Sequence, residues 1–79
     1  MLHYNEERNL NINVYHKLKE EIKRKYHGRY VAIVKGQLIA SADTFDEALK
    51  KSEGAFPEAL HRLVFNSDDD NPIAEDEDI

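Results

Sequence analysis

The sequence predicts one α+β domain, a two-layer sandwich in which helices pack on a three-stranded, mainly antiparallel sheet in the order α-β-β-α-β. Three observations support this fold class. Apolar residues recur every four positions near the start, a β-branched and aromatic hairpin follows, and a capped helix then separates that hairpin from a third apolar strand. With 79 residues the chain holds a single domain, whose core is thin and whose stability is marginal.

Residues 12–27 are predicted to form an amphipathic helix. Its apolar stripe consists of Val14, Leu18, Ile22 and Tyr26. Asn11 or Asn13 is the expected N-cap, and Gly28 supplies the left-handed stop. Residues 1–11 show no clear periodicity, so we expect a flexible N-terminal segment followed by a domain over residues 12–66.

Residues 29–42 are predicted to form a hairpin that turns at Lys35-Gly36. The expected cross-strand pairs are Val34 with Gln37, Ile33 with Leu38, Ala32 with Ile39, and Val31 with Ala40. One face of the hairpin then carries Val31, Ile33, Leu38 and Ala40, and the other carries Tyr30, Ala32, Val34 and Ile39. Both faces are therefore apolar.

A second helix is predicted to begin at Thr44, because Glu47 three residues later completes a capping box, and to end at Gly54. Pro57 is expected to open one more helical turn. Residues 62–66 form the predicted third strand, which we place beside the first strand of the hairpin. Residues 67–79 are predicted to be a disordered acidic tail, since they contain too few apolar side chains to offset the entropy of ordering.

The apolar hairpin leaves two arrangements of the helices open. If both helices cover one face, the other face is exposed, and it becomes a candidate protein interface formed by Tyr30, Ala32, Val34 and Ile39. A partner protein or a homodimer, through this face or through a sheet edge, then follows. If instead one helix covers each face, no such surface exists.

Charge is unevenly distributed along the chain. The net charge of −5 combines +2 over residues 1–66 with −7 over residues 67–79. The basic residues concentrate around the end of the first predicted helix, where the candidate polyanion-binding residues are Lys23, Arg24, Lys25, Arg29 and Lys35. A nucleic-acid-binding module is therefore the alternative function, with the acidic tail screening these cations.

The sequence contains none of the common catalytic motifs, so no enzyme activity, catalytic residue or cofactor is expected. His16 and Glu20 would supply only two metal ligands, and the run from Asp68 to Asp70 lacks the glycine and final glutamate of a calcium loop, so no metal site is expected either. The absence of a signal peptide and of a long apolar segment predicts a cytoplasmic protein that does not enter a membrane.

Two resemblances concern residues 30–49. The hairpin Tyr30-Val-Ala-Ile-Val-Lys-Gly36 and the helix start Asp43-Thr-Phe-Asp-Glu-Ala-Leu49 resemble a family of small, uncharacterised prokaryotic α+β domains that are frequent in archaea. This resemblance covers residues 14–66 and implies a fold without an established activity. Residues 43–49 are also similar to the strand-to-helix step of Hic-type antitoxins, which bind and neutralise a toxin. The sequence therefore predicts a non-catalytic protein-interaction or regulatory module, and the similarity to Hic-type antitoxins favours an antitoxin-like role for it.

Overall fold

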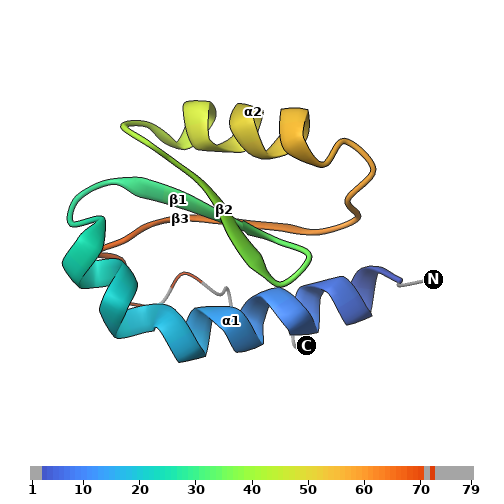
Figure 1. Cartoon of the computed structure of the whole chain (residues 1–79), viewed down its shortest axis with the longest axis horizontal. Coiled ribbons are helices and arrows are strands. Elements are labelled where there is room, and N and C mark those ends of the chain that lie inside the picture. Colours follow the sequence, from blue (N-terminus) through green and yellow to red (C-terminus); the bar gives the residue numbers. More distant parts are fainter. Residues whose placement is uncertain (1–2, 71, 73–79) are drawn as a thin grey trace.

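The computed structural model describes residues 3–70 and 72. Its elements are α1 (Tyr4–Lys25), β1 (Tyr30–Val34), β2 (Gln37–Ala42), α2 (Phe45–Ala55) and β3 (Arg62–Asn66). The α+β fold and the element order α-β-β-α-β are those predicted from the sequence, and the third strand has the predicted bounds. Figure 1 shows the sheet lying between the two helices.

The three strands form one antiparallel sheet in the order β2-β1-β3. The third strand therefore lies beside the first, as predicted, and β1 is central. Its residues Val31, Ala32, Ile33 and Val34 have no exposed surface at all. This explains why β1 is apolar on both faces: a central strand covered on both sides has no face in contact with water.

The predicted hairpin turn at Lys35-Gly36 is confirmed, but the predicted strand register is correct for only two residue pairs. Lys35 and Gly36 both have positive φ, at 53° and 76°, as a two-residue type I′ turn requires. Val34 pairs with Gln37 and Ile33 with Leu38, but a bulge then places Ala32 opposite Ala40 and Val31 opposite Ser41. The predicted pairs of Ala32 with Ile39 and Val31 with Ala40 are wrong, because the bulge inserts one extra residue into β2.

The helices cover opposite faces of the sheet, so the structure has three layers, α1, sheet and α2, where the sequence predicted two (Figure 1). Tyr15 and Ile22 of α1 form the main core with alternate strand residues, namely Val31, Ile33, Leu63 and Phe65. The other face of β1 lies under α2, whose Ala48 and Ser52 are fully buried. Of the two arrangements left open by the sequence, one helix on each face is therefore correct.

This arrangement removes the exposed face that the candidate protein interface required. Ala32 and Val34 are 0% exposed, so no partner reaches them in the folded chain. Tyr30 and Ile39 are half-buried, and the ring of Tyr30 packs edge-to-face against Phe45 of α2 at 6.2 Å. The small residues of α2 explain its close approach, because Ala48 and Ser52 let the helix backbone lie near the sheet.

Helix α1 begins at Tyr4, eight residues before the predicted start. Asn11 is therefore an interior helix residue, and it is completely buried, as is Glu7 one turn earlier at 3% exposure. The expectation of a flexible segment over residues 1–11 is wrong from Tyr4 onward. The apolar period fails in this part of the helix because polar side chains, with specific partners described below, take the positions that face the protein interior.

Helix α2 begins as predicted, since the Thr44 hydroxyl accepts a hydrogen bond from the backbone N–H of Glu47 at 3.1 Å. It continues through Gly54 to Ala55, and Gly54 does not adopt the left-handed conformation expected of a stop. The predicted helical turn after Pro57 is a simple turn, in which the N–H of Ala59 bonds the carbonyl of Phe56.

Candidate functional site

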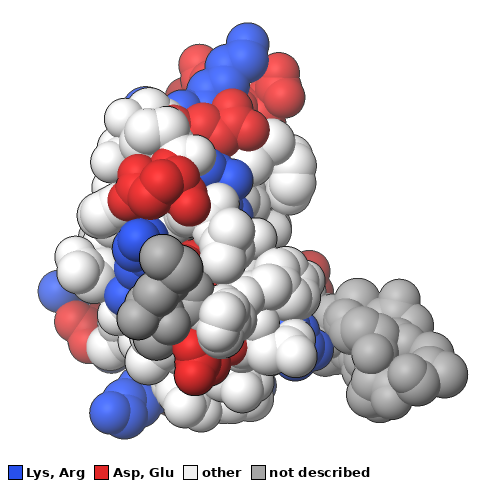
Figure 2. Space-filling model, turned by 90° about the vertical axis from the view of Figure 1, so that its right-hand side faces the viewer, with Lys and Arg blue, Asp and Glu red and all other residues white. Residues whose placement is uncertain are grey.

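Four of the five candidate polyanion-binding residues are paired with carboxylates. Lys23 lies 2.5 Å from Asp70, Lys25 lies 2.9 Å from Glu21, Arg29 lies 2.6 Å from Asp43, and Lys35 lies 3.3 Å from Glu58. Arg24 is exposed and forms no ion pair with the residues that the structure describes. Figure 2 shows a different side of the molecule, the one that carries the N-terminal end of α1, and there too blue and red side chains lie next to one another. The structure thus does not bring the five cations together as one unscreened patch.

The ion pairs shift the pKa values of their members in the expected directions. A hydrogen bond from Lys23 lowers the pKa of Asp70, and the same contact raises the pKa of Lys23. Lys25 lowers the pKa of Glu21 in the same way. The pKa of Glu58 is lowered first by a backbone hydrogen bond and then by Lys35. The side chains of Asp70, Glu21 and Glu58 are 81%, 45% and 61% exposed, so the shifts show contact with a cation rather than large contributions to stability.

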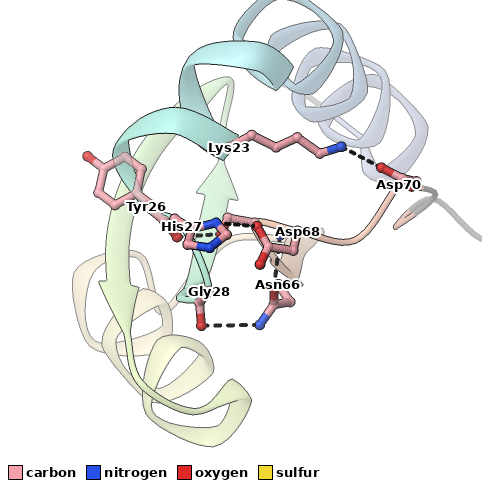
Figure 3. Close-up of polar contacts among 8 residues, drawn as sticks. Lys23, Tyr26, His27, Gly28, Asn66, Asp68 and Asp70 are labelled. Carbon is pink, nitrogen blue, oxygen red and sulfur yellow. Dashed lines mark hydrogen bonds and ion pairs between the residues drawn. The ribbon is translucent and has the colours of Figure 1, made fainter.

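The residues that follow β3 are fastened to the end of α1 (Figure 3). The Ser67 hydroxyl donates a hydrogen bond to the carbonyl of Tyr26, and the Ser67 backbone N–H donates to Arg29 at 2.8 Å. Asp68 lies 3.1 Å from Nδ1 of His27, and Asp70 reaches Lys23 from the same segment. Ser67 is 2% exposed and belongs to the packed domain, although the sequence assigned it to the tail.

The predicted contact between acidic tail and basic segment is present in the first part of the tail. It consists of the pairs formed by Asp68 and Asp70 with His27 and Lys23. The rest of the predicted disordered tail, residue 71 and residues 73–79, lies outside the described residues. The charge asymmetry along the sequence was therefore a valid signal for an internal contact.

A groove runs along the outer side of β3, between the two helix layers, with a cavity volume of about 320 Å³. We call it the β3 groove, and it is lined by Tyr4 and Arg8 of α1, Phe45 and Leu49 of α2, and Arg62 and Val64 of β3. Pro72 also lines the groove, so the chain's own C-terminal part reaches one of its walls. Tyr4 and Phe45 are 51% and 48% exposed, which is high for aromatic side chains in so small a domain. No sequence pattern predicted this groove, since its walls come from three elements far apart in the chain.

The outer edge of β3 offers unpaired main-chain groups to this groove. Ser67 donates to Arg29, its opposite residue in the register of β1 and β3, so Phe65 and Leu63 also point their N–H and C=O groups toward β1. The N–H and C=O groups of the alternate residues Arg62 and Val64 then point outward. No further strand pairs with this edge among the described residues, and we call it the open edge.

Two buried polar residues of α1 hold the chain at the start of β3. The carboxylate of Glu7 accepts hydrogen bonds from the backbone N–H groups of Leu60, at 2.9 Å, and His61, at 3.4 Å. Asn11 accepts from the N–H of Gly36 at 2.8 Å, and its amide nitrogen lies 2.9 Å from Nδ1 of His61. The i,i+4 spacing of Glu7 and Asn11 was a signal that both face inward, but their partners are 25 to 54 residues away.

The guanidinium of Arg62 lies at the same end of the groove. Its Nη2 donates to the carbonyl of Phe56 at 2.8 Å, which holds the side chain beside the loop that follows α2. Its Nε is buried and has no hydrogen-bond partner within the described part of the chain. Arg8 and Arg62 are the basic residues that line the groove near the start of β3.

The structure shows no grouping of three or more His, Asp or Glu side chains that would hold a metal ion, as far as residues 3–70 and 72 are concerned. No helix in that part of the chain combines the length and the apolar character needed to cross a membrane.

Comparison with protein families identifies the family of this chain. A family of unknown function, DUF5678, matches residues 21–61, which is slightly more than half of the 79-residue chain. The chain belongs to this family. The DUF5678 match includes the end of α1, the hairpin, α2 and the loop that leads to β3, and hence all five candidate polyanion-binding residues. It stops at His61, immediately before β3.

No curated protein and no solved structure matches the chain. The DUF5678 assignment agrees with the resemblance to small uncharacterised domains noted from the hairpin and the helix start. It attaches no activity to any residue of the site. The geometry of the end of α1 and of the β3 groove is therefore the basis on which a function can be inferred.

Proposed function

We propose that this DUF5678 domain is a non-catalytic protein-interaction module that binds by adding an extended polypeptide segment to the open edge of β3. The observation that carries the proposal is the outward-facing N–H and C=O pair of Val64, which lies beside a groove of about 320 Å³. In strand addition, main-chain hydrogen bonds supply affinity and flanking pockets supply specificity. Both requirements are met in the β3 groove.

The side chains around the groove indicate the chemistry of the added segment. Tyr4 and Phe45 offer exposed aromatic surface on the two sides of β3, as protein interfaces commonly do. Arg8 and Arg62 line the groove as well, and their charge favours a segment with acidic side chains next to apolar ones. We therefore expect an extended segment that alternates apolar and acidic residues.

The charge pairing at the end of α1 favours a protein partner over a polyanion. A nucleic acid would have to displace four carboxylates to reach Lys23, Lys25, Arg29 and Lys35. An antitoxin-like role is a narrower form of the same proposal, in which the partner is a toxin. The similarity of residues 43–49 to Hic-type antitoxins supports that form, and Phe45 in this stretch lines the groove.

Panning a library of random displayed peptides against the chain, immobilised at low density, tests strand addition. Enriched peptides should bind the wild type and the Val64→Thr variant, which keeps the N–H group and the β-branched shape. They should not bind Val64→Pro, which removes the outward N–H. Proline is tolerated at such a position because an edge strand does not need that donor for its own sheet.

Nuclear magnetic resonance shifts on peptide binding locate the site independently. The largest changes should occur at β3 and at the aromatic side chains of the groove. The proposal is overturned if no peptide is enriched, if peptides bind Val64→Pro as well as wild type, or if the shifts fall at the end of α1 instead.

A further inference from the structure

We infer that the segment added at the open edge is β3 of a second copy of this chain, paired antiparallel about a two-fold axis at Val64. This inference rests on the proposed function, because it names the partner of the same edge. Two such edges would join the sheets of both copies into one continuous sheet. Each copy would then supply a strand to the other in the same way, as a two-fold interface requires.

The hydrogen-bonding pattern of β3 fits pairing with itself. An axis at Val64 places Val64 opposite its own copy and Arg62 opposite Asn66 of the second copy. In β3 these are the residues whose main-chain groups point away from β1. Antiparallel strands bond through opposed residues that both face the shared edge, so the N–H and C=O groups of Val64 would bond those of its copy. The outward groups of Arg62 would face Asn66 of the second copy, whose carbonyl also accepts from the N–H of Asp69 in its own chain at 2.9 Å.

The order of charges along β3 is self-complementary for an antiparallel arrangement. The start of the strand is basic, with Arg62 in the strand and Arg8 in the adjoining groove wall. The segment after the strand contains the exposed carboxylates Asp68, Asp69 and Asp70, of which Asp68 contacts His27 and Asp70 contacts Lys23 within the same copy. Antiparallel pairing brings the basic start of one copy to the acidic end of the other, whereas parallel pairing would bring like charges together.

The apolar groups beside the edge are also placed for contact across the axis. Val64 lies at the centre of the open edge, with Phe45 and Leu49 from α2 lining one side of the groove. Tyr4, from α1, lines the other side. Pairing at Val64 would bring each wall of the groove toward the equivalent wall of the second copy. The exposed aromatic surface of Tyr4 and Phe45 would then be removed from water.

Single cysteine variants test the register directly, since the chain has no cysteine. Residues opposed in a hydrogen-bonded antiparallel pair have Cα atoms about 5.5 Å apart, within the range of roughly 4.4–6.8 Å for disulfides. Val64→Cys should therefore form a disulfide-linked dimer under mild oxidation. Gln37→Cys, an exposed position on the opposite edge strand, is the control and should remain largely unlinked.

A mixing experiment separates this register from non-specific cross-linking. A mixture of Arg62→Cys and Asn66→Cys proteins should give a linked heterodimer in several-fold excess over the products that either variant forms alone. Equal yields from the mixture and the single variants would overturn the inference, as would efficient linking of Gln37→Cys.

Sedimentation equilibrium completes the test with chains that lack cysteine. Wild type and Val64→Thr should sediment at about twice the 9.2 kDa monomer mass at high micromolar concentration, and folded Val64→Pro at the monomer mass. A monomeric wild type, or a Val64→Pro dimer, overturns the second-copy inference. If peptides still bind the β3 edge of a monomeric wild type, the proposed function survives without the second-copy inference. If neither peptide binding nor dimer formation depends on Val64, the proposed function and the second-copy inference both fail.

Discussion

Replacing Asn11 by Ala should destabilise the domain strongly, because one buried amide connects three segments. Its Oδ1 accepts from Gly36 in the hairpin turn at 2.8 Å, and its Nδ2 lies 2.9 Å from Nδ1 of His61, ahead of β3. The Asn11 side chain is 0% exposed, so water cannot replace it without a change in packing. The substitution therefore leaves polar groups of both partners without a bond.

The size of the effect follows from these contacts. Each of the two short hydrogen bonds contributes about 1 kcal/mol net, and the abandoned partners add about 1 kcal/mol more because both are partly buried. The higher helix propensity of alanine offsets about 0.6 kcal/mol of this loss in the free energy of unfolding. We expect a loss of about 2–3 kcal/mol, a large part of the roughly 4–12 kcal/mol that a domain of this length has.

Urea unfolding followed by circular dichroism measures this loss. With a slope of about 1 kcal/mol per molar urea, the midpoint should fall by about 2–3 M. Asn13→Ala is the matched control on the same helix, and at this exposed position it should leave stability unchanged or raise it slightly. Asn11→Asp keeps the acceptor for Gly36 but loses the amide donor, so it should lie between Asn11→Ala and wild type.

Equal, small effects of Asn11→Ala and Asn13→Ala would refute this reasoning. A loss of about 1 kcal/mol at Asn11 alone is the size expected for an N-cap. That result would favour the helix start near residue 12 that the sequence predicted, and it would contradict an interior position for Asn11.

Three further outcomes are expected. Leu63→Pro should unfold the domain, since it removes a hydrogen bond between β3 and β1 and a buried side chain. Val64→Pro should lower the stability of the domain far less, and thermal unfolding of the two variants measures the difference. A chain ending at Ser67 should bind heparin more tightly at low salt, because Lys23 loses its carboxylate partner, and unchanged retention would contradict the screening contact. The Asp70 carboxyl should titrate below its ordinary pKa of 3.8 in a carbon-detected titration, and Lys23→Gln should restore the ordinary pKa. Because folding lowers this pKa, the stabilisation from the contact is fully present above pH 3.8 and is lost as the pH falls through the lowered pKa.

Local sequence signals predicted most of the fold correctly. Thr44 begins α2 because capping is a contact between neighbours in the chain, and Lys35-Gly36 forms the turn because glycine tolerates positive φ. The apolar run from Val31 to Val34 predicted a well-covered strand, and this strand is central. In each case the deciding interaction lies within a few residues of the pattern that predicts it.

The errors share a different cause, since each depends on contacts distant in sequence. The start of α1 was missed because Glu7 and Asn11 face inward to bind main-chain groups of the hairpin turn and of the loop before β3. The bulge at Ile39, between Leu38 and Ala40, shifts half of the hairpin register without a glycine or proline to mark it. The covering of Ala32 and Val34 by α2 depends on the path of the whole chain.

The basic segment shows how a charge count along the sequence overestimates a binding surface. Counted locally, residues 17–35 carry a net charge of +5. In the fold, the acids that pair with Lys23, Arg29 and Lys35 come from three other places in the chain, and each lies within 4 Å of its cation. Most of the local excess is thereby neutralised, so the surface potential that a polyanion would meet is much smaller than the sequence indicates.

The open edge of β3 follows from the size of the domain. Three strands leave two sheet edges, and the β2 edge is partly covered where Lys51 of α2 binds the carbonyl of Ser41 at 2.9 Å. At β3, the outward groups of Arg62 and Val64 instead face a groove with exposed aromatic walls. Natural proteins protect such edges against unwanted pairing, and a short strand with an arginine at its start allows only a partner of suitable charge order. In the proposed dimer, the same five residues would both limit aggregation and select the strand that they pair with.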